Sequence, residues 1–310
     1  MQHRLRGNIM LLITAAIWGL AFVAQSDGMN YVGPFTYNAC RTLIGGVVLI
    51  PVIGLLKLMP DKSSEKHEKA PLKTTVAGGI ICGLIFTVAG MLQQYGISMT
   101  TAGKAGFVTA LYIIIVPIFG LVIYRRTTLK AWICCLIAIA GFYLLCINEG
   151  FSVSTGDLLV LLCAFFFAAH IMVIDRFNSK NVDGTLMSCI QFFTAGIIML
   201  VCMFIFEQPS PDAILAAWLP ILYGGAMSCG VAYTLQIIGQ RYTDPNTATL
   251  LMSLESVFAA LSGWLLLNES LSIKELAGCA LVFIAVVAAQ ININKKKKKG
   301  GNDLNEKVSQ

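Results

Sequence analysis

Glu255 is the only acidic side chain deep inside an apolar stretch of the sequence. It lies about ten residues into that stretch, which is roughly 15 Å along a helix that rises 1.5 Å per residue. An ionised carboxylate in such surroundings is costly unless it is paired or solvated. A group of this kind binds a cation, carries a proton or joins two helices through a hydrogen bond, and the sequence leaves these alternatives open.

Arg41 is the basic counterpart, about seven residues, or roughly 10 Å of helix, into another apolar stretch. A guanidinium group binds an anionic ligand group, extends toward the surface or bonds backbone carbonyls. Four polar or aromatic residues inside other apolar stretches are further candidates for a ligand cavity. The candidate substrate-binding set is Trp18, Arg41, Gln93, Tyr112, Gln236 and Glu255. Packing between helices is the alternative role for each of them.

Metal and catalytic signatures are missing from the sequence. Most of the 10 cysteines lie inside apolar stretches, and their spacing matches no zinc site. His170 is a lone histidine, which favours a hydrogen bond between helices. No HExxH, Gly-x-Ser-x-Gly or phosphate-loop motif occurs in a usable position. We therefore expect no catalytic residue, no metal site and no cofactor.

The composition says what surrounds these residues. Hydrophobic residues make up 57% of the chain and charged residues 12%, whereas soluble domains have about 45–50% and about 25%. So few charges cannot cover a surface that faces water, so most of the chain must face lipid. In lipid every backbone polar group must bond internally, which predicts helices. The basic run Lys295 to Lys299 is expected to bind lipid headgroups and not nucleic acid.

Apolar stretches of about twenty residues predict ten transmembrane helices. They cover residues 8–26, 34–57, 74–97, 102–124, 130–147, 157–175, 185–206, 216–239, 246–267 and 272–293. With a cytosolic N-terminus, nearly all of the 22 Lys and Arg residues fall on the cytosolic side, and only Lys104 and Lys274 fall outside. This asymmetry follows the positive-inside rule and places both termini in the cytosol.

The two parts of the chain also match each other in sequence. Gly7-Asn8 and Trp18-Gly19 match Gly156-Asp157 and Phe167-Ala168, and Gln93, Gly96, Thr100 and Ala105 match Gln236, Gly239, Thr243 and Ala248 at a constant offset. We expect a first repeat over residues 7–147, a second over 156–293 and a basic cytosolic tail over 294–310. Because each repeat has five helices, the second enters the membrane from the opposite side. Inverted repeats of this kind are typical of secondary transporters, which bind substrate near the midplane.

These residues carry a resemblance to a known family. The segment from Ala15 to Phe22 resembles the opening motif of the EamA-type transporters in the drug/metabolite transporter superfamily, and Arg41 matches that family's usual Arg. The segments Leu254 to Ala260 and Leu266 to Glu269 resemble its ninth helix and the motif that closes it. The resemblance covers nearly the whole chain.

Two positions depart from the family's pattern. Ser256 stands where the family has Pro, and Arg125-Arg126 stands where it has Glu-Arg. The resemblance implies ten helices, five plus five inverted, with both ends cytosolic. It also implies transport of small metabolites, amino acids or amphipathic drugs, often outward.

We therefore expect an all-α integral membrane protein with ten transmembrane helices as two inverted five-helix repeats, placed in the cell membrane as a multi-pass protein. The expected function is secondary transport of a small metabolite, amino acid or amphipathic drug by alternating access, in the direction of export. The expected partners are a small-molecule substrate and the lipid bilayer, with no nucleic acid and with a proton as the candidate coupling ion; the oligomeric state stays open. The alternative is an integral membrane enzyme acting on a lipid-soluble substrate, which would need acid, base or metal residues clustered at one membrane face.

Overall fold

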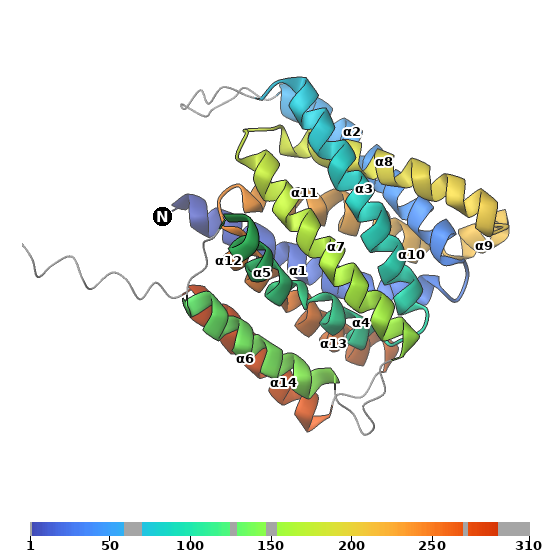
Figure 1. Ribbon diagram of the computed structural model, residues 1–310. Helices are drawn as coiled ribbons and strands as arrows, with labels where there is room; N and C mark the ends of the chain where they lie inside the picture. Colours follow the sequence, from blue (N-terminus) through green and yellow to red (C-terminus); the bar gives the residue numbers. More distant parts are fainter. Residues whose placement is uncertain (1, 59–69, 125–128, 147–153, 269–271, 291–310) are drawn as a thin grey trace, which may run out of the picture.

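The protein is a bundle of helices (Figure 1). The computed structural model describes residues 2–58, 70–124, 129–146, 154–268 and 272–290, and every regular element in these ranges is a helix. The basic tail at 294–310, Arg125-Arg126 and Glu269 lie outside the described residues. The helices are α1 (Gln2–Gly28), α2 (Pro34–Leu58), α3 (Leu72–Ile97), α4 (Ala102–Thr109), α5 (Tyr112–Tyr124), α6 (Leu129–Cys146), α7 (Thr155–Asn178), α8 (Gly184–Phe206), α9 (Pro211–Ala216), α10 (Trp218–Leu222), the π-helix η1 (Tyr223–Ala232), α11 (Tyr233–Gln240), α12 (Pro245–Met252), α13 (Leu254–Leu267) and α14 (Ile273–Gln290).

Eight stretches of the described chain are long and apolar enough to cross a membrane. They are Arg4–Gly28, Pro34–Leu56, Leu72–Ile97, Ala102–Leu121, Thr155–Asn178, Gly184–Phe206, Trp218–Gln240 and Pro245–Leu267. Two further apolar helices, Trp132–Gly141 and Leu276–Ala285, are shorter. The protein is thus a multi-pass membrane protein, while the count of ten spanning helices and their inverted relation stay predictions.

Polar residues at the helix ends set where the helices begin. The Ser154 hydroxyl accepts a hydrogen bond from the Asp157 backbone N–H, and the Asp157 carboxylate accepts one from the Ser154 N–H, which forms a capping box at the start of α7. Asp183 and Asp244 accept the equivalent backbone bonds at the starts of α8 and α12. Asn268 ends α13 in the left-handed conformation, with φ of 54°.

The start of α2 is capped by a residue from a distant part of the chain. Glu207, just after α8, accepts hydrogen bonds from the backbone N–H groups of Phe35 (2.9 Å) and Thr36 (2.8 Å) and from the Thr36 hydroxyl (2.6 Å). A carboxylate is favourable there because the N-terminus of a helix carries partial positive charge. This cap fixes the entry of α2 against the end of α8.

Three expected spans are not continuous helices. The span 102–124 is divided into α4 and α5, the span 246–267 into α12 and α13, and the span 216–239 contains the π-helix η1. The first two breaks use i→i+3 backbone bonds, such as Ile113 N to Ala110 O (3.0 Å) and Ser256 N to Ser253 O (3.2 Å). The second break lies at Ser253, three residues before Ser256.

Pro117 lies inside α5 and has no N–H to donate to the carbonyl of Ile113. The thiol of Cys135, on α6, donates a hydrogen bond to that carbonyl oxygen at 3.3 Å. A buried carbonyl that the proline leaves free is therefore satisfied by the neighbouring helix.

The largest helix contacts join the two matched parts of the chain. α2 packs on α8 and η1, α3 packs on α7 and α8, α1 packs on α13, and α6 lies beside α14 at one edge of the bundle (Figure 1). Every one of these pairs joins a helix that ends by residue 146 to one that begins after residue 154. The core of the protein therefore lies between the two matched parts.

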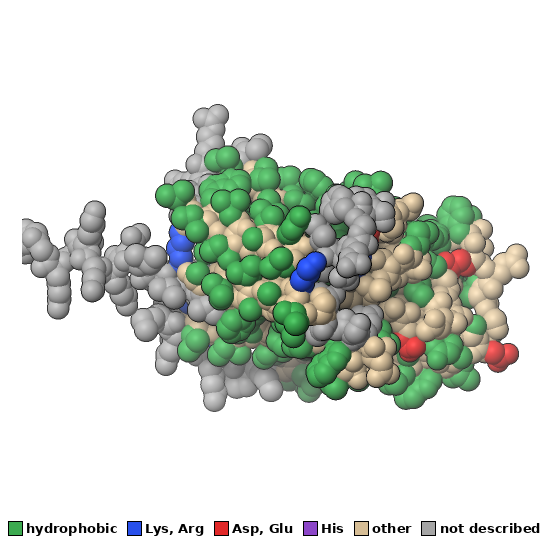
Figure 2. Space-filling view, turned by 90° about the horizontal axis from the view of Figure 1, so that it is seen from below, with side chains coloured by type: hydrophobic (Ala, Val, Ile, Leu, Met, Phe, Trp, Pro, Cys, Tyr) green, Lys and Arg blue, Asp and Glu red, His purple; other side chains and the backbone are tan. Residues whose placement is uncertain are grey.

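The exterior of the bundle is apolar and its interior carries polar groups. Figure 2 shows a face dominated by hydrophobic side chains, with a few basic groups at its left and centre and acidic ones toward its right. Large apolar side chains such as Phe204 and Leu265 are about 70% exposed, whereas Arg41, Gln93, His170 and Glu255 are buried. Apolar outside and polar inside is the distribution expected of a bundle in lipid.

Candidate functional site

The central helix α1 and the second half of the bundle meet at Gly19. A Cβ atom built on Gly19 would lie 2.2 Å from Cβ of Phe258 and 2.9 Å from the backbone N of Ala259, both on α13. Only a residue without a side chain allows the two backbones to approach so closely. This contact brings Trp18 of α1 and Glu255 of α13 to the walls of one cavity.

The two broken helices supply one wall residue each at matching positions. Tyr112 is the first residue of α5 after one break, and Glu255 lies in the first turn of α13 after the other. The Ser253 and Ser256 hydroxyls donate to the carbonyls of Leu250 (2.9 Å) and Ser253 (2.7 Å). These side-chain bonds satisfy backbone carbonyls in and next to the break, as is required within a membrane-spanning segment.

The cavity between the two matched parts is narrow, with a volume of about 30 Å³. All six candidate residues predicted from the sequence line it. The complete lining is Trp18, Ala21, Phe22, Gln25, Arg41, Gln93, Thr109, Tyr112, Phe167, Ile171, Ser228, Tyr233, Gln236 and Glu255. Residues far apart in the sequence thus converge on one buried site of mixed polar and aromatic character.

Five polar atoms of this lining are buried without a hydrogen-bond partner. They are Nε1 of Trp18, Oε1 of Gln25, the hydroxyl oxygen of Tyr112, Oε1 of Gln236 and Oε1 of Glu255. The Tyr112 hydroxyl and the Glu255 carboxyl lie close enough to interact with each other, although they fall outside ordinary hydrogen-bond geometry. Buried polar groups are nearly always bonded to protein or water, so a set of five that share one cavity marks a place for water or a ligand.

Arg41 is almost completely buried, with 2% of its surface exposed. Its Nε donates a hydrogen bond to Oδ1 of Asn38 at 2.7 Å, and Nδ2 of Asn38 donates to the Gly90 carbonyl at 3.1 Å. The guanidinium carbon lies 5.6 Å from the ring centre of Tyr37. Arg41 and Glu255 both line the cavity, and no ion pair joins them.

Gln93 is hydrogen-bonded to Thr109, a residue that the sequence analysis did not identify as a candidate. Its Nε2 donates a hydrogen bond to the Thr109 hydroxyl at 3.2 Å, and Thr109 is in turn 3.8 Å from the sulfur of Cys163. Trp18 contacts Tyr233, with ring centres 4.6 Å apart. Thr109 precedes the α4–α5 break, and that break carries no Gly or Pro that would have marked it in the sequence.

His170 does not line the cavity but packs edge-on against the ring of Tyr233, which does. Its Nε2 is 2.8 Å from Oε1 of Gln191, which confirms the expected hydrogen bond between helices, here α7 and α8. Within the described residues no group of three or more His, Cys, Asp or Glu side chains is placed to hold a metal ion.

Comparison with known proteins then identifies the family. The profile of the EamA-like transporter family matches the chain twice, over residues 5–147 and again over residues 154–289. The chain belongs to the EamA-like transporter family. One relative in this comparison is an uncharacterized transporter of Archaeoglobus fulgidus, 30% identical over 94% of this chain and 87% of its own length.

Two further similarities fit the EamA-like assignment. The uncharacterized transporter YoaV of Bacillus subtilis is 24% identical, over 93% of this chain and 97% of its own. A solved crystal structure, titled only as that of a protein, has a TM-score of 0.73 at 19% identity, covering 92% of this chain and 96% of that chain. At that identity the structure shows the fold alone. The family and the relatives' names support a membrane transporter and not an enzyme.

Proposed function

We propose that this EamA-like protein is a secondary transporter that moves a small metabolite, amino acid or amphipathic drug outward across the cytoplasmic membrane by alternating access. The substrate binds in the cavity between the two matched parts of the chain. The observation that carries this proposal is the convergence of the six candidate residues on one buried cavity, with five polar atoms that lack partners.

The chemistry of the lining suggests how a solute is held. Trp18 and Tyr112 offer hydrogen-bond donors, Gln236 and Glu255 offer acceptors, and Arg41 supplies a buried positive charge. The rings of Trp18 and Tyr233 form an aromatic wall. Such a site suits a solute with an apolar or aromatic body and with both donor and acceptor groups.

The matching breaks support the proposed inverted repeat. The α4–α5 break and the α12–α13 break lie at the same offset that relates Thr100 to Thr243 in the sequence match. Discontinuous helices at corresponding positions of two halves are typical of transporter binding sites. In this proposal the ten helices form two inverted sets of five, with both termini cytosolic.

The test begins with the wild-type protein in liposomes. We expect counterflow of at least one compound from a panel of amino acids and dyes, compared with and without a proton gradient. Trp18→Phe should keep the fold, because the lost N–H has no protein partner, and should weaken counterflow by about 2- to 10-fold, the worth of one hydrogen bond. The matched control is Trp264→Phe, whose indole is on the exterior of α13. Equal activity of the two variants would argue against this cavity as the binding site.

Glu255 is proposed as the proton-coupling group, and Glu255→Gln tests it. The change removes the charge and preserves the shape of the side chain. We expect the variant to exchange substrate between compartments but to lose accumulation driven by the proton gradient. Gradient-driven accumulation by a well-folded Glu255→Gln protein would rule the coupling role out.

A further inference from the structure

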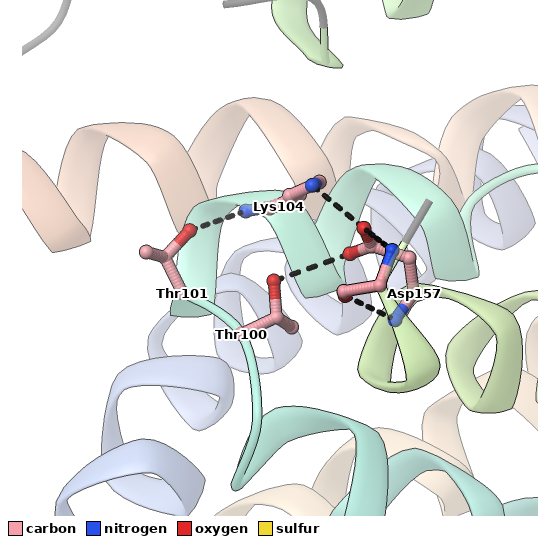
Figure 3. Close-up of polar contacts among 5 residues, drawn as sticks. Thr100, Thr101, Lys104 and Asp157 are labelled. Carbon is pink, nitrogen blue, oxygen red and sulfur yellow. Dashed lines mark hydrogen bonds and ion pairs between the residues drawn. The ribbon is translucent and has the colours of Figure 1, made fainter. Parts of the chain in front are cut away.

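Asp157 gathers an unusual number of polar contacts at one end of the bundle (Figure 3). Its Oδ2 lies 2.7 Å from Nζ of Lys104 and accepts a hydrogen bond from the Ser154 N–H at 3.1 Å, while its Oδ1 accepts one from the Thr100 hydroxyl at 3.3 Å. The Asp157 side chain is 9% exposed and that of Lys104 is 35% exposed. We call this group of four residues the Asp157 contact.

The Asp157 contact joins the two matched parts of the chain. Thr100 and Lys104 belong to the α3–α4 connection and to α4, whereas Ser154 and Asp157 begin α7. Beside it the backbones nearly touch, because a Cβ on Gly156 would lie 2.8 Å from Cβ of Met99 and 3.0 Å from the Gly96 carbonyl oxygen. The end of α3 and the start of α7 are therefore in close backbone contact at this end of the bundle.

The opposite end repeats the arrangement without the Lys–Asp ion pair. The Thr243 hydroxyl donates a hydrogen bond to Oδ1 of Asn8 at 3.1 Å, and a Cβ on Gly7 would lie 3.0 Å from the Gly239 carbonyl oxygen. In the sequence match Asn8 corresponds to Asp157 and Thr243 to Thr100, and at that offset Thr247 corresponds to Lys104. We call this the Asn8 contact. The N-terminus and α12 lie on the left in Figure 1, away from the start of α4 at the lower right.

The helix starts at the two ends also correspond. Thr101 accepts a hydrogen bond from the Lys104 backbone N–H at 3.3 Å, and Asp244 accepts one from the Thr247 backbone N–H at 3.0 Å. The positions of the Lys–Asp pair at one end are thus held by neutral Thr247 and Asn8 at the other, where Asp244 stands at the position of Thr101. A hydrogen bond between charged groups is about twice as strong as a neutral one.

We propose that the Lys104–Asp157 pair is a latch that holds its end of the cavity shut and biases the empty carrier toward conformations in which that end is closed. The inference rests on the proposed alternating access, in which each end opens in turn. Because the Asn8 contact has no Lys–Asp ion pair, it opens more readily, and the two ends differ in free energy although their frames match. A ligand or a mutation shifts such an equilibrium only through its different interaction with the two states.

The test is amide hydrogen exchange, measured by mass spectrometry on the full chain in lipid nanodiscs without substrate. Lys104→Gln removes the ion pair and leaves the Ser154–Asp157 capping box in place. We expect exchange to rise several-fold in residues 98–107 and 154–160 and to fall in residues 239–248 and 5–12. Lys274→Gln is the matched control, because Lys274 is exposed and is predicted to lie on the same side of the membrane.

A second variant moves the latch to the other end. Asn8→Asp combined with Thr247→Lys should place a Lys–Asp pair in the matching frame and reverse the exchange pattern. No change in Lys104→Gln, or equal increases at both ends, would overturn the latch. Counterflow in liposomes tests the proposed function separately. Absence of transport by the wild-type protein would refute that function. Hydrogen exchange that rises at one end and falls at the other would still support a latch between two conformations.

Discussion

The close contact between α1 and α13 at Gly19 predicts how much a Gly19→Ala substitution destabilises the protein. In Gly19→Ala the new Cβ would lie 2.2 Å from Cβ of Phe258, 2.8 Å from its backbone carbon and 2.9 Å from the backbone N of Ala259. Carbon atoms rest at about 3.5–4.0 Å from each other. The two helices must therefore separate by roughly 1.5 Å at this point, and no flexible side-chain end is available to absorb the change.

The cost follows from what is known of overpacked cores. An extra methyl group in a well-packed core typically destabilises a protein by about 1–3 kcal/mol. The intrinsic preference of a helix for Ala over Gly returns about 0.5–1 kcal/mol, so we expect a net loss of up to roughly 2.5 kcal/mol. The separation also moves Trp18 away from Glu255 across the cavity, so transport should fall by more than the loss of folded protein explains.

The assay is thermal unfolding of the purified variant in detergent, together with counterflow normalised to folded protein. The control is Gly54→Ala on α2, where no atom lies within 4 Å of the new Cβ. The control should melt at or slightly above the wild-type temperature, since it gains helix preference without a clash. A Gly19→Ala protein as stable as Gly54→Ala would refute the close approach of α1 and α13.

Three further predictions concern other parts of the molecule. Glu207→Gln should destabilise the protein by about 1–3 kcal/mol in the same unfolding assay, because an amide nitrogen cannot accept the hydrogen bonds at the start of α2. Asp212→Asn, at an exposed position, should have no such effect. Equal melting temperatures of these two variants would count against the cap. Cys135→Ala should cost about 1 kcal/mol, because the Ile113 carbonyl loses its donor, and Cys135→Ser should restore most of it; identical melting of the two variants would contradict this. A reporter fused after Val308 should be active only in the cytosol, and activity on the outer side would overturn the predicted orientation.

The sequence was sufficient to predict the all-helical membrane fold because apolar length and missing charge leave few other structures. It also identified Trp18, Arg41, Gln93, Tyr112, Gln236 and Glu255 as polar or aromatic groups within apolar stretches, and these line one cavity. Their type was informative because a polar group in lipid needs a reason to be there.

Other features were beyond the sequence for physical reasons. The helix breaks at Ala110 and Ser253 use tighter backbone hydrogen bonds and no Gly or Pro at the break itself, so their residue types give no signal. Thr109 and Ser228 line the cavity, but hydroxyl side chains in helices usually bond their own backbone and are not distinctive. Glu207 reads as a loop residue, and only the folded chain shows that it caps α2.

The placement of the core between the two matched parts has a consequence for biosynthesis. The ribosome delivers residues 2–146 to the bilayer before α7 to α14 exist. At about 5–20 residues per second, the rest of the chain needs roughly 10–30 s. During that interval α2 lacks the Glu207 carboxylate, the Tyr37 hydroxyl lacks the Pro220 carbonyl to which it donates at 3.0 Å, and α3 lacks both helices that cover it. The nascent first half therefore remains an unassembled set of helices that exposes polar side chains until translation ends. Chaperones and membrane proteases have access to it during this interval.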